Sequence, residues 1–180
     1  IEPSSKDTAP AALSGILHAS TLSKDPIVLI CPADHWINDK IYFQNIITNS
    51  IQHITKDNII TFGIRPRSPH TGYGWITCDS NFSSKIKKLY KVTNFIEKPD
   101  LVKAETLIKE SFNFWNSGIF LGRASTFINA YRESSDSIYE LVKKSYDNAE
   151  TDLDFLRLNK VMWHKIDKIS IDYAIIEKFN

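Results

Sequence analysis

The spacing of apolar residues predicts that helices and strands alternate along the first third of the chain. Apolar positions at helical spacing predict helices over Thr8 to about Ser23, with Thr8 as N-cap and Pro10 in the first turn, and over Asn38 to about Thr55. Continuous apolar runs predict short strands, buried on both faces, at Pro26–Ile30 and Asn58–Ile64. Two such strands joined by a helix form a βαβ unit, so we expect them to be neighbouring parallel strands.

The rest of the chain continues this mixed pattern. Proline and glycine residues predict a loop between Arg65 and Gly74. Further strands are expected at Tyr73–Cys78, at Leu89–Ile96 and at Phe112–Gly122, the last one interrupted by Asn116–Gly118. Further helices are expected over Asp100–Ser111, in two stretches of Ala124–Ala149 that break near Ser134, from Thr151 onward and over Ser170–Lys178. The fold class is therefore α/β, with a mixed, mostly parallel sheet, helices on both faces and no interdomain linker within residues 1–180.

Composition and charge exclude several classes of protein. The 180 residues include 22 basic and 21 acidic side chains, a net charge of +1, so neither a nucleic acid nor a membrane surface is an expected partner. Lys85, Lys87 and Lys88 are the tightest basic group, and we interpret them as a solvated strand or turn. The two cysteines, Cys31 and Cys78, lack metal-ligand spacing, which favours the reducing cytoplasm. No apolar run approaches the ~20 residues that a helix needs to span a membrane. The sequence leaves open whether the protein forms a homo-oligomer.

The two ends of the chain resemble interior sequence. The chain begins with Ile1 rather than methionine, its one methionine is Met162, and its last residues continue a predicted helix. We therefore expect a fragment of a longer catalytic domain that lacks both ends. A processed mature protein is the alternative.

Asp34 is a candidate metal ligand because it directly follows the predicted strand Pro26–Ile30. Ligands of open α/β sheets bind beyond the carboxyl ends of the strands, and Mg²⁺ takes oxygen ligands, usually one or two of them from the protein. Position alone fits a second role equally well, because Asp34 could cap the following helix. His35 has no second histidine at ligand spacing, so we expect a structural role for it.

Three further segments place polar groups where a loop or strand end could present them to a ligand. The loop Thr71–Gly74 has paired glycines, which let backbone amides approach a ligand, and it contains Tyr73; a common turn is the alternative. Glu97 and Lys98 end a strand, where the lysine could neutralise a phosphate and the glutamate could accept sugar hydroxyls; an exposed charge pair is the alternative. Asn116 interrupts an apolar strand and could bind a sugar hydroxyl; a β-bulge is the alternative.

These segments occur in an order that resembles a known family. The matching stretches are Glu2-Pro3, Thr8-Ala9-Pro10-Ala11, Pro32-Ala33-Asp34-His35, Thr61-Phe62-Gly63-Ile64, Thr71-Gly72-Tyr73-Gly74, Phe95-Ile96-Glu97-Lys98-Pro99-Asp100, Trp115-Asn116-Ser117-Gly118 and Ser170-Ile171-Asp172-Tyr173-Ala174. In sequence and order they resemble the bacterial mannose-1-phosphate guanylyltransferases, from Glu2 to Lys178. The last two stretches together are specific to this branch, whereas Glu-Lys-Pro is shared by many sugar nucleotidyltransferases.

The resemblance implies a Rossmann-like nucleotidyltransferase domain that converts GTP and mannose 1-phosphate to GDP-mannose and pyrophosphate, for nucleotide-sugar and surface polysaccharide biosynthesis. By the matched positions, Asp34 would be a Mg²⁺ ligand, and Lys98 would lie near the sugar phosphate as the candidate catalytic residue. Glu97 and Asn116 would hold sugar hydroxyls. The other implied substrate contacts are Gly72 and Tyr73 at the sugar pocket, and Thr8, Ala9 and Pro10 near the nucleotide. Asp172 matches the motif without an implied role.

The chain also departs from the family pattern. The family's glycine-rich loop with Arg-Leu-Trp-Pro, which wraps the GTP phosphates, would precede Glu2, and its Trp-Ser-Asp-Val-Gly motif, which holds a second metal-binding aspartate, would follow the chain. We therefore expect little turnover from the chain alone, and a non-catalytic remnant of such an enzyme is the alternative function. Lys6 replaces a usual arginine and His70 a common glutamate. A glycosyltransferase would need Asp-x-Asp at a strand end, but Asp152–Asp154 lies at a predicted helix start.

Overall fold

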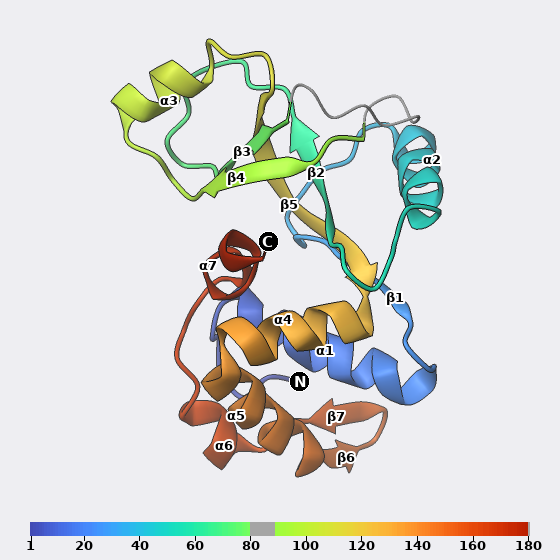
Figure 1. Cartoon of the computed structure of the whole chain (residues 1–180). Helices are drawn as coiled ribbons and strands as arrows, with labels where there is room; N and C mark the ends of the chain where they lie inside the picture. The colour runs from blue at the N-terminus through green and yellow to red at the C-terminus, as the bar shows by residue number, and fades with distance from the viewer. Residues whose placement is uncertain (80–88, 180) are drawn as a thin grey trace. The chain divides into compact units, whose positions relative to one another are not determined.

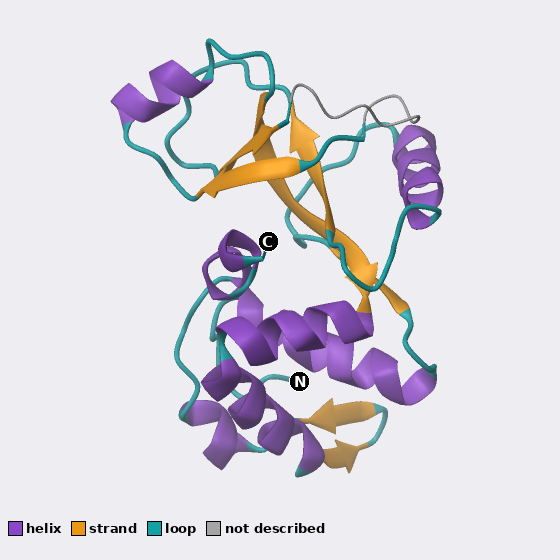
Figure 2. Ribbon diagram, viewed as in Figure 1, coloured by secondary structure: helices purple, strands orange, loops and turns teal. Residues whose placement is uncertain are grey.

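A computed structural model of the chain describes residues 1–79 and 89–179, so Lys85, Lys87 and Lys88 lie outside the described residues. The chain divides into two compact units, the first formed by Ile1–Ile60 and Phe120–Asn180, the second by Thr61–Ile119. The elements in chain order are α1 (Thr8–Leu22), β1 (Ile27–Ile30), α2 (Lys40–Ile51), β2 (Ile60–Ile64), β3 (Trp75–Cys78), β4 (Val92–Ile96), α3 (Leu101–Leu107), β5 (Asn113–Arg123), α4 (Ala124–Ser134), α5 (Asp136–Asp147), β6 (Glu150–Asp152), β7 (Phe155–Arg157), α6 (Lys160–His164), α7 (Ile171–Ala174) and a 3₁₀ helix at Ile176–Lys178 (Figure 1). Helices and strands mix along the chain, which confirms the predicted α/β class (Figure 2).

The helices α1, α4, α5, α6 and α7 share the main hydrophobic core of the first unit. In α1, Leu13, Ile16 and Leu17 recur at helical spacing and are buried, so one face of this helix joins the core. The helix packs against α4, α5 and α7, and α5 packs against α6. The larger core side chains without exposed surface are Leu13, Ile16, Phe120, Phe127, Tyr131, Val142, Trp163 and Ile175.

The start of α1 differs from the prediction at one residue. Asp7, not Thr8, is the N-cap, and its Oδ1 accepts a hydrogen bond from the Thr8 N–H at 2.8 Å. The Thr8 hydroxyl instead accepts a hydrogen bond from the Ile171 N–H at 2.8 Å, which ties the start of α7 to the start of α1. Both side chains can cap a helix, and the long-range contact with α7 decides between them. Pro10 lies in the first turn, as predicted.

The strand β1 forms where a strand was predicted, but its neighbours and its burial are different. Its residues pair antiparallel with β5, from Ile27 opposite Arg123 to Ile30 opposite Phe120. In the described sheet, β1 and β2 each pair with β5 and not with each other. The pairings whose register is known, β1–β5, β3–β4 and β3–β5, are all antiparallel, so the expected pair of neighbouring parallel strands is wrong.

The burial of β1 alternates along the strand. Val28 and Ile30 pack against the core of the first unit, whereas Ile27 and Leu29 are 39% and 38% exposed. The prediction of a strand buried on both faces is therefore wrong. An unbroken apolar run does not reveal which of its two faces a protein covers.

The second unit is built around β3. Its strand pairs with β4 on one side and with the first part of β5 on the other. The helix α3 begins after Asp100, which caps it as predicted by accepting a hydrogen bond from the Lys103 N–H at 2.7 Å. Ala104 and Leu107 on this helix pack against the buried Trp75 of β3. β5 runs through Asn116–Gly118 without ending, and the expected interruption is reduced to a left-handed residue, Gly118, with φ of 69°.

The expected helix from Thr151 is wrong, because this segment forms an antiparallel hairpin. β6 and β7 pair with Thr151 opposite Leu156. The turn between them contains Leu153 in a left-handed conformation with φ of 54°, which a helix could not accommodate. The next helix, α6, begins only at Lys160, after Asn159 accepts hydrogen bonds from the N–H groups of Val161 and Met162. The Asp-x-Asp sequence is therefore at a hairpin turn.

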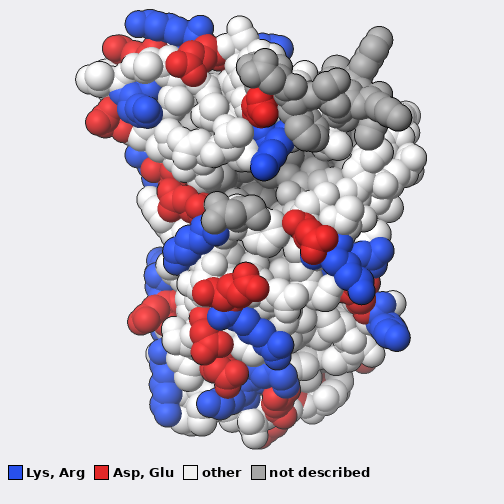
Figure 3. All heavy atoms as spheres, in the orientation of Figure 1, with Lys and Arg blue, Asp and Glu red and all other residues white. Residues whose placement is uncertain are grey.

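The surface carries both signs of charge. Lysine and arginine side chains are interspersed with aspartate and glutamate on the face drawn in Figure 3. Along α5, Lys143 pairs with Asp147 and Lys144 with Glu140, contacts of a kind that contribute about 0.3–0.5 kcal/mol each. No helix in the described part of the chain is long and apolar enough to cross a membrane.

The two free cysteines are expected to differ in their reaction with iodoacetamide. Burial raises the pKa of the Cys78 thiol to about 11, and Cys78 is only 8% exposed, whereas Cys31 is exposed with a smaller upward shift of its pKa from burial. Since the thiolate is the reactive form, Cys78 should react at least about tenfold more slowly than Cys31 at neutral pH. Mass spectrometry of the alkylated protein over time measures both rates. A Cys31→Ser variant should lack the fast phase, and equal rates in the original chain would contradict the burial of Cys78.

Candidate functional site

Gly74 brings Glu97 and Asn116 together in the second unit. A Cβ atom built at Gly74 would lie 2.5 Å from Glu97 Oε2 and 3.5 Å from Asn116 Cβ. The Asn116 N–H also donates a hydrogen bond to the Gly74 carbonyl oxygen at 2.7 Å. Because glycine has no side chain, the Glu97 carboxylate can occupy the space above it. Two polar residues that are distant in sequence therefore meet at one point.

The strand register explains this meeting. Trp75 lies opposite Ile96 on β4 and opposite Trp115 on β5. In antiparallel pairs, the residue before a paired position faces the residue after its partner. Gly74, which precedes Trp75, therefore lies beside Glu97 and Asn116, which follow the two partners.

The side chain of Asn116 is oriented by β2. The Thr61 hydroxyl donates a hydrogen bond to Asn116 Oδ1 at 3.0 Å and also lies 3.3 Å from the Ile119 carbonyl oxygen. This contact fixes the orientation of the Asn116 amide, whose oxygen is the acceptor.

An aromatic cluster forms the wall next to this point. The Tyr73 ring lies edge-on to Trp115, with ring centroids 5.2 Å apart, and stacks on the His70 ring at 4.1 Å. The Trp115 indole Nε1–H is buried and has no hydrogen-bond partner among the described residues. Tyr73 remains 47% exposed, so its ring could cover a bound ligand.

Glu97 and Lys98 follow the end of β4 and differ in exposure. The Glu97 side chain is 10% exposed and that of Lys98 is 60% exposed, with 3.5 Å between Lys98 Nζ and Glu97 Oε1. Lys98 has a φ of 47°, in the left-handed region that costs a residue with a side chain roughly 1–2 kcal/mol. This backbone turn lets two consecutive side chains approach each other, which they could not do within a strand. Such local strain is common at functional sites.

The predicted nucleotide contacts lie at the start of α1 in the first unit. Ala9 and Pro10 are buried, whereas Thr8 is exposed. The Tyr131 hydroxyl donates a hydrogen bond to the Ala9 carbonyl oxygen at 2.8 Å. Burial raises the pKa of Tyr131 above its usual value, and the Asp172 carboxylate adds to this shift, so the hydroxyl keeps its proton. The start of α1 is thus rigidly held, and Thr8 is the residue of the three that a ligand could reach.

Lys6 holds the backbone in the same region. Its Nζ donates hydrogen bonds to the carbonyl oxygens of His164 at 3.1 Å and Ile166 at 2.6 Å. A lysine can make these two contacts because carbonyl oxygens do not require the planar fork of arginine. We therefore assign Lys6 a structural role.

Asp34 lies exposed in the loop between β1 and α2, in the first unit. No group of three or more His, Cys, Asp and Glu residues in the described part of the chain could hold a metal ion. One carboxylate still fits Mg²⁺, because this ion keeps several waters and binds substrate phosphates alongside one or two protein carboxylates. Asp34 does not cap α2, since Asp39 accepts the hydrogen bond from the Tyr42 N–H. The capping alternative for Asp34 is therefore wrong, and metal binding stays a prediction.

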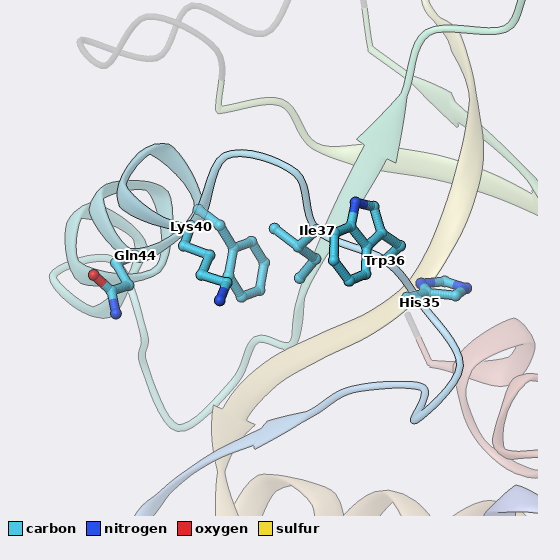
Figure 4. Close-up of a pocket in the computed structure, with 6 residues that line it drawn as sticks. His35, Trp36, Ile37, Lys40 and Gln44 are labelled. Atoms are coloured by element: carbon cyan, nitrogen blue, oxygen red, sulfur yellow. The ribbon is translucent and has the colours of Figure 1, made fainter.

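A hollow of about 430 Å³ lies just after Asp34 (Figure 4). Its described lining is formed by the loop before α2 and the first turns of this helix, namely His35, Trp36, Ile37, Lys40, Phe43 and Gln44. Trp36 is 88% exposed, and none of the described lining residues is a carboxylate. The hollow therefore does not account for the predicted metal site.

The structure unites some of the predicted site residues. Tyr73, Glu97, Lys98 and Asn116 gather around Gly74 in the second unit, with Gly72 in the same loop. Thr8, Ala9, Pro10 and Asp34 belong to the first unit, so one cleft shared by all of them stays a prediction. Sequence analysis missed Gly74 as the residue that admits Glu97, and Thr61 as the partner of Asn116. Both belong to quoted motif stretches, but only the strand register reveals their contacts.

Residues 1–170 match the model of the family described as nucleotidyl transferase. The xanthan biosynthesis protein XanB of Xanthomonas campestris is 35% identical over 178 residues, which cover 99% of this chain and 37% of that protein. The mannose-1-phosphate guanylyltransferase RfbM of Salmonella typhimurium is 35% identical over 179 residues, which cover 98% of this chain and 37% of that protein. The chain thus spans little more than a third of the length of these relatives.

Two solved structures have a similar fold. A protein from Helicobacter pylori described as a mannose-6-phosphate isomerase has a TM-score of 0.86 and 27% identity, with 99% of this chain and 67% of that chain covered. A protein from Thermus thermophilus described as a mannose-1-phosphate geranyltransferase has a TM-score of 0.85 and 26% identity, with 100% of this chain and 50% of that chain covered.

Proposed function

Because the chain belongs to the nucleotidyl transferase family, we propose that the protein joins GTP and mannose 1-phosphate into GDP-mannose and pyrophosphate. The observation that carries this proposal is the convergence of Glu97 and Asn116 at Gly74, since these residues come from separate motifs that each predict contacts with a sugar. The product would serve nucleotide-sugar and polysaccharide biosynthesis. A cytoplasmic location is part of the proposal, since Cys31 and Cys78 are both free thiols.

In this proposal the second unit binds mannose 1-phosphate. The Glu97 carboxylate accepts hydrogen bonds from sugar hydroxyls, and the Asn116 amide donates one to a hydroxyl oxygen. The ring of Tyr73 covers the apolar face of the sugar, and the Gly72 backbone lets the loop approach it closely. Since the Glu97 side chain is only 10% exposed, its hydrogen bonds to the sugar compete little with water.

In this proposal, cations offset the negative charge of the phosphate groups on both substrates. Lys98, exposed beside Glu97, reaches the phosphate of the sugar. Asp34 would hold Mg²⁺ together with water and phosphate oxygens, and the ion would offset the negative charge of the nucleotide. The start of α1 carries the positive end of the helix dipole, so Thr8 there would suit a nucleotide phosphate.

The proposed reaction requires positioning more than covalent chemistry. An oxygen of mannose 1-phosphate attacks the α-phosphorus of GTP in line, and the bond to the leaving pyrophosphate breaks. Glu97 and Asn116 fix the sugar so that its phosphate has few orientations to sample. Lys98 offsets charge that accumulates as the two anions approach, and it is the residue that we propose to be catalytic.

Isothermal titration calorimetry of the chain with mannose 1-phosphate tests the proposal at the sugar site. Glucose 1-phosphate, which differs in the orientation of one hydroxyl, and free mannose, which lacks the phosphate, are the comparison ligands. We expect mannose 1-phosphate to bind more tightly than either. A chain that binds neither sugar phosphate would show that the residues around Gly74 are not the sugar site.

Lys98→Ala is expected to lower the affinity for mannose 1-phosphate by up to about tenfold, because its ammonium group faces water and gains only a moderate energy from the phosphate. The affinity for free mannose should not change. The matched control is Lys103→Ala, which removes another exposed lysine, on α3. An equal loss of affinity for mannose and mannose 1-phosphate would mean that Lys98 shapes the pocket instead of binding phosphate.

Gly74→Ala is expected to weaken the binding of mannose 1-phosphate by about tenfold or more. The new methyl group would lie 2.5 Å from Glu97 Oε2, so the carboxylate must leave its position. The control is Gly15→Ala on α1, where an added Cβ meets nothing within 4 Å. That change should raise the free energy of unfolding by about 0.5–1 kcal/mol without altering sugar affinity. Unchanged affinity in Gly74→Ala would show that Glu97 does not bind the sugar from this position.

A further inference from the structure

His70 makes several contacts that together define the conformation of the loop Thr71–Gly74. Its Nδ1 accepts a hydrogen bond from the Gly72 N–H at 3.0 Å. Its ring stacks on that of Tyr73, with centroids 4.1 Å apart and an angle of 16° between the planes. Its carbonyl oxygen accepts a hydrogen bond from Trp75 Nε1 at 2.9 Å. The ring also lies edge-on to Trp115 at 6.1 Å.

The geometry selects one chemical form of the imidazole. A ring nitrogen that accepts a hydrogen bond carries no proton, so Nδ1 is bare and the proton of the neutral ring is on Nε2. The position of Gly72 depends on the same ring, because a Cβ there would lie 2.9 Å from His70 Cε1 and 3.2 Å from Nδ1. Glycine at position 72 and histidine at position 70 therefore fit each other.

We propose that His70 is a positioning residue for the sugar pocket: its ring holds Gly72 by the hydrogen bond and Tyr73 by stacking, so the loop is ordered before the sugar phosphate binds. This proposal rests on the proposed function for the identity of the ligand, and on the described contacts alone for the ordering of the loop. A preformed loop binds more tightly because its ordering entropy is not lost on binding. His70 itself needs no contact with the sugar.

Three substitutions separate the two contacts. His70→Asn keeps an acceptor for the Gly72 N–H but loses the ring, His70→Phe keeps a ring for Tyr73 but loses the acceptor, and His70→Ala loses both. Calorimetry with mannose 1-phosphate measures affinity, and ¹⁵N relaxation of the ligand-free chain measures the backbone order of Gly72 and Tyr73. We expect His70→Ala to lose about tenfold in affinity, with order parameters that fall from about 0.85 to below about 0.6, and the other two variants to lie between it and the original chain.

Each outcome decides the proposal. Wild-type order parameters in His70→Ala would overturn it, whatever the affinity, because a direct contact with the sugar would then explain any loss. Wild-type order parameters at Gly72 in His70→Phe would overturn the role of the Nδ1 acceptor. If the original chain binds no mannose 1-phosphate but its loop loosens in His70→Ala, the positioning role stands and the proposed function fails at this site.

Discussion

Glu97→Gln is expected to weaken the binding of mannose 1-phosphate by about 10- to 100-fold, because hydrogen bonds to a charged group contribute about 1.5–3 kcal/mol. The carboxylate can accept from two sugar hydroxyls, and an amide offers one acceptor oxygen and an NH₂ group that would face a donor. The side chain is 10% exposed, so water can do little to replace the lost contact. Glutamine has nearly the same shape, which leaves the fit against Gly74 intact.

Calorimetry with the Glu97→Gln variant measures this loss, and circular dichroism checks that the variant folds. Glu105→Gln, on the exposed side of α3, makes the same chemical change away from the site and should bind as the original chain does. If Glu97→Gln retains full affinity, the carboxylate does not bind sugar hydroxyls, and the ion pair with Lys98 becomes its main role.

Trp163→Ala is expected to lower the free energy of unfolding of the first unit by about 3–5 kcal/mol. Trp163 is fully buried in α6, among residues of the shared helical core. Its Nε1–H donates a hydrogen bond to the Ser4 carbonyl oxygen at 2.7 Å. The substitution leaves a large cavity and also removes the partner of this carbonyl, and both effects destabilise the native state.

Urea unfolding followed by circular dichroism measures the change. The matched control is Trp36→Ala, because Trp36 is 88% exposed and its loss should change the free energy of unfolding by at most about 0.5 kcal/mol. Similar destabilisation by the two substitutions would contradict the packing described for α6. Sugar binding in the second unit provides a separate measure of whether destabilisation stays within the first unit.

The residues of the candidate site could be selected from the sequence, but their contacts could not. Glu97, Lys98 and Asn116 stood out because polar side chains at the end or middle of an apolar strand require an explanation. The resemblance then grouped them by motif order. Their approach to Gly74 depends on the pairing of β3 with both β4 and β5, which joins residues more than twenty positions apart. His70 was visible only as a departure from the family pattern, and its ring contacts with Tyr73 and Trp115 emerged from the folded loop.

The helices followed from the sequence most faithfully. α1, α3, α4 and α5 lie within the expected ranges, and Asp100 caps α3 as predicted. Helical hydrogen bonds join residues four apart, so periodicity and capping residues carry most of the information that a helix needs. The exception, at Thr151, is a segment of charged and apolar residues whose local preferences were overridden by the pairing of β6 with β7.

By itself the sequence determined the α/β class, the positions of most helices and strands, and the family to which the chain belongs, because these depend on local periodicity and on ordered motifs. Only the tertiary structure decided which strands are neighbours and in which direction they run. Backbone N–H and C=O groups are the same at every residue, so the apolar run of β1 could not specify antiparallel pairing with β5 instead of parallel pairing with β2. The same limit applies to the site: Glu97 reaches the space above Gly74 because two strand registers coincide there, and no local pattern records that coincidence.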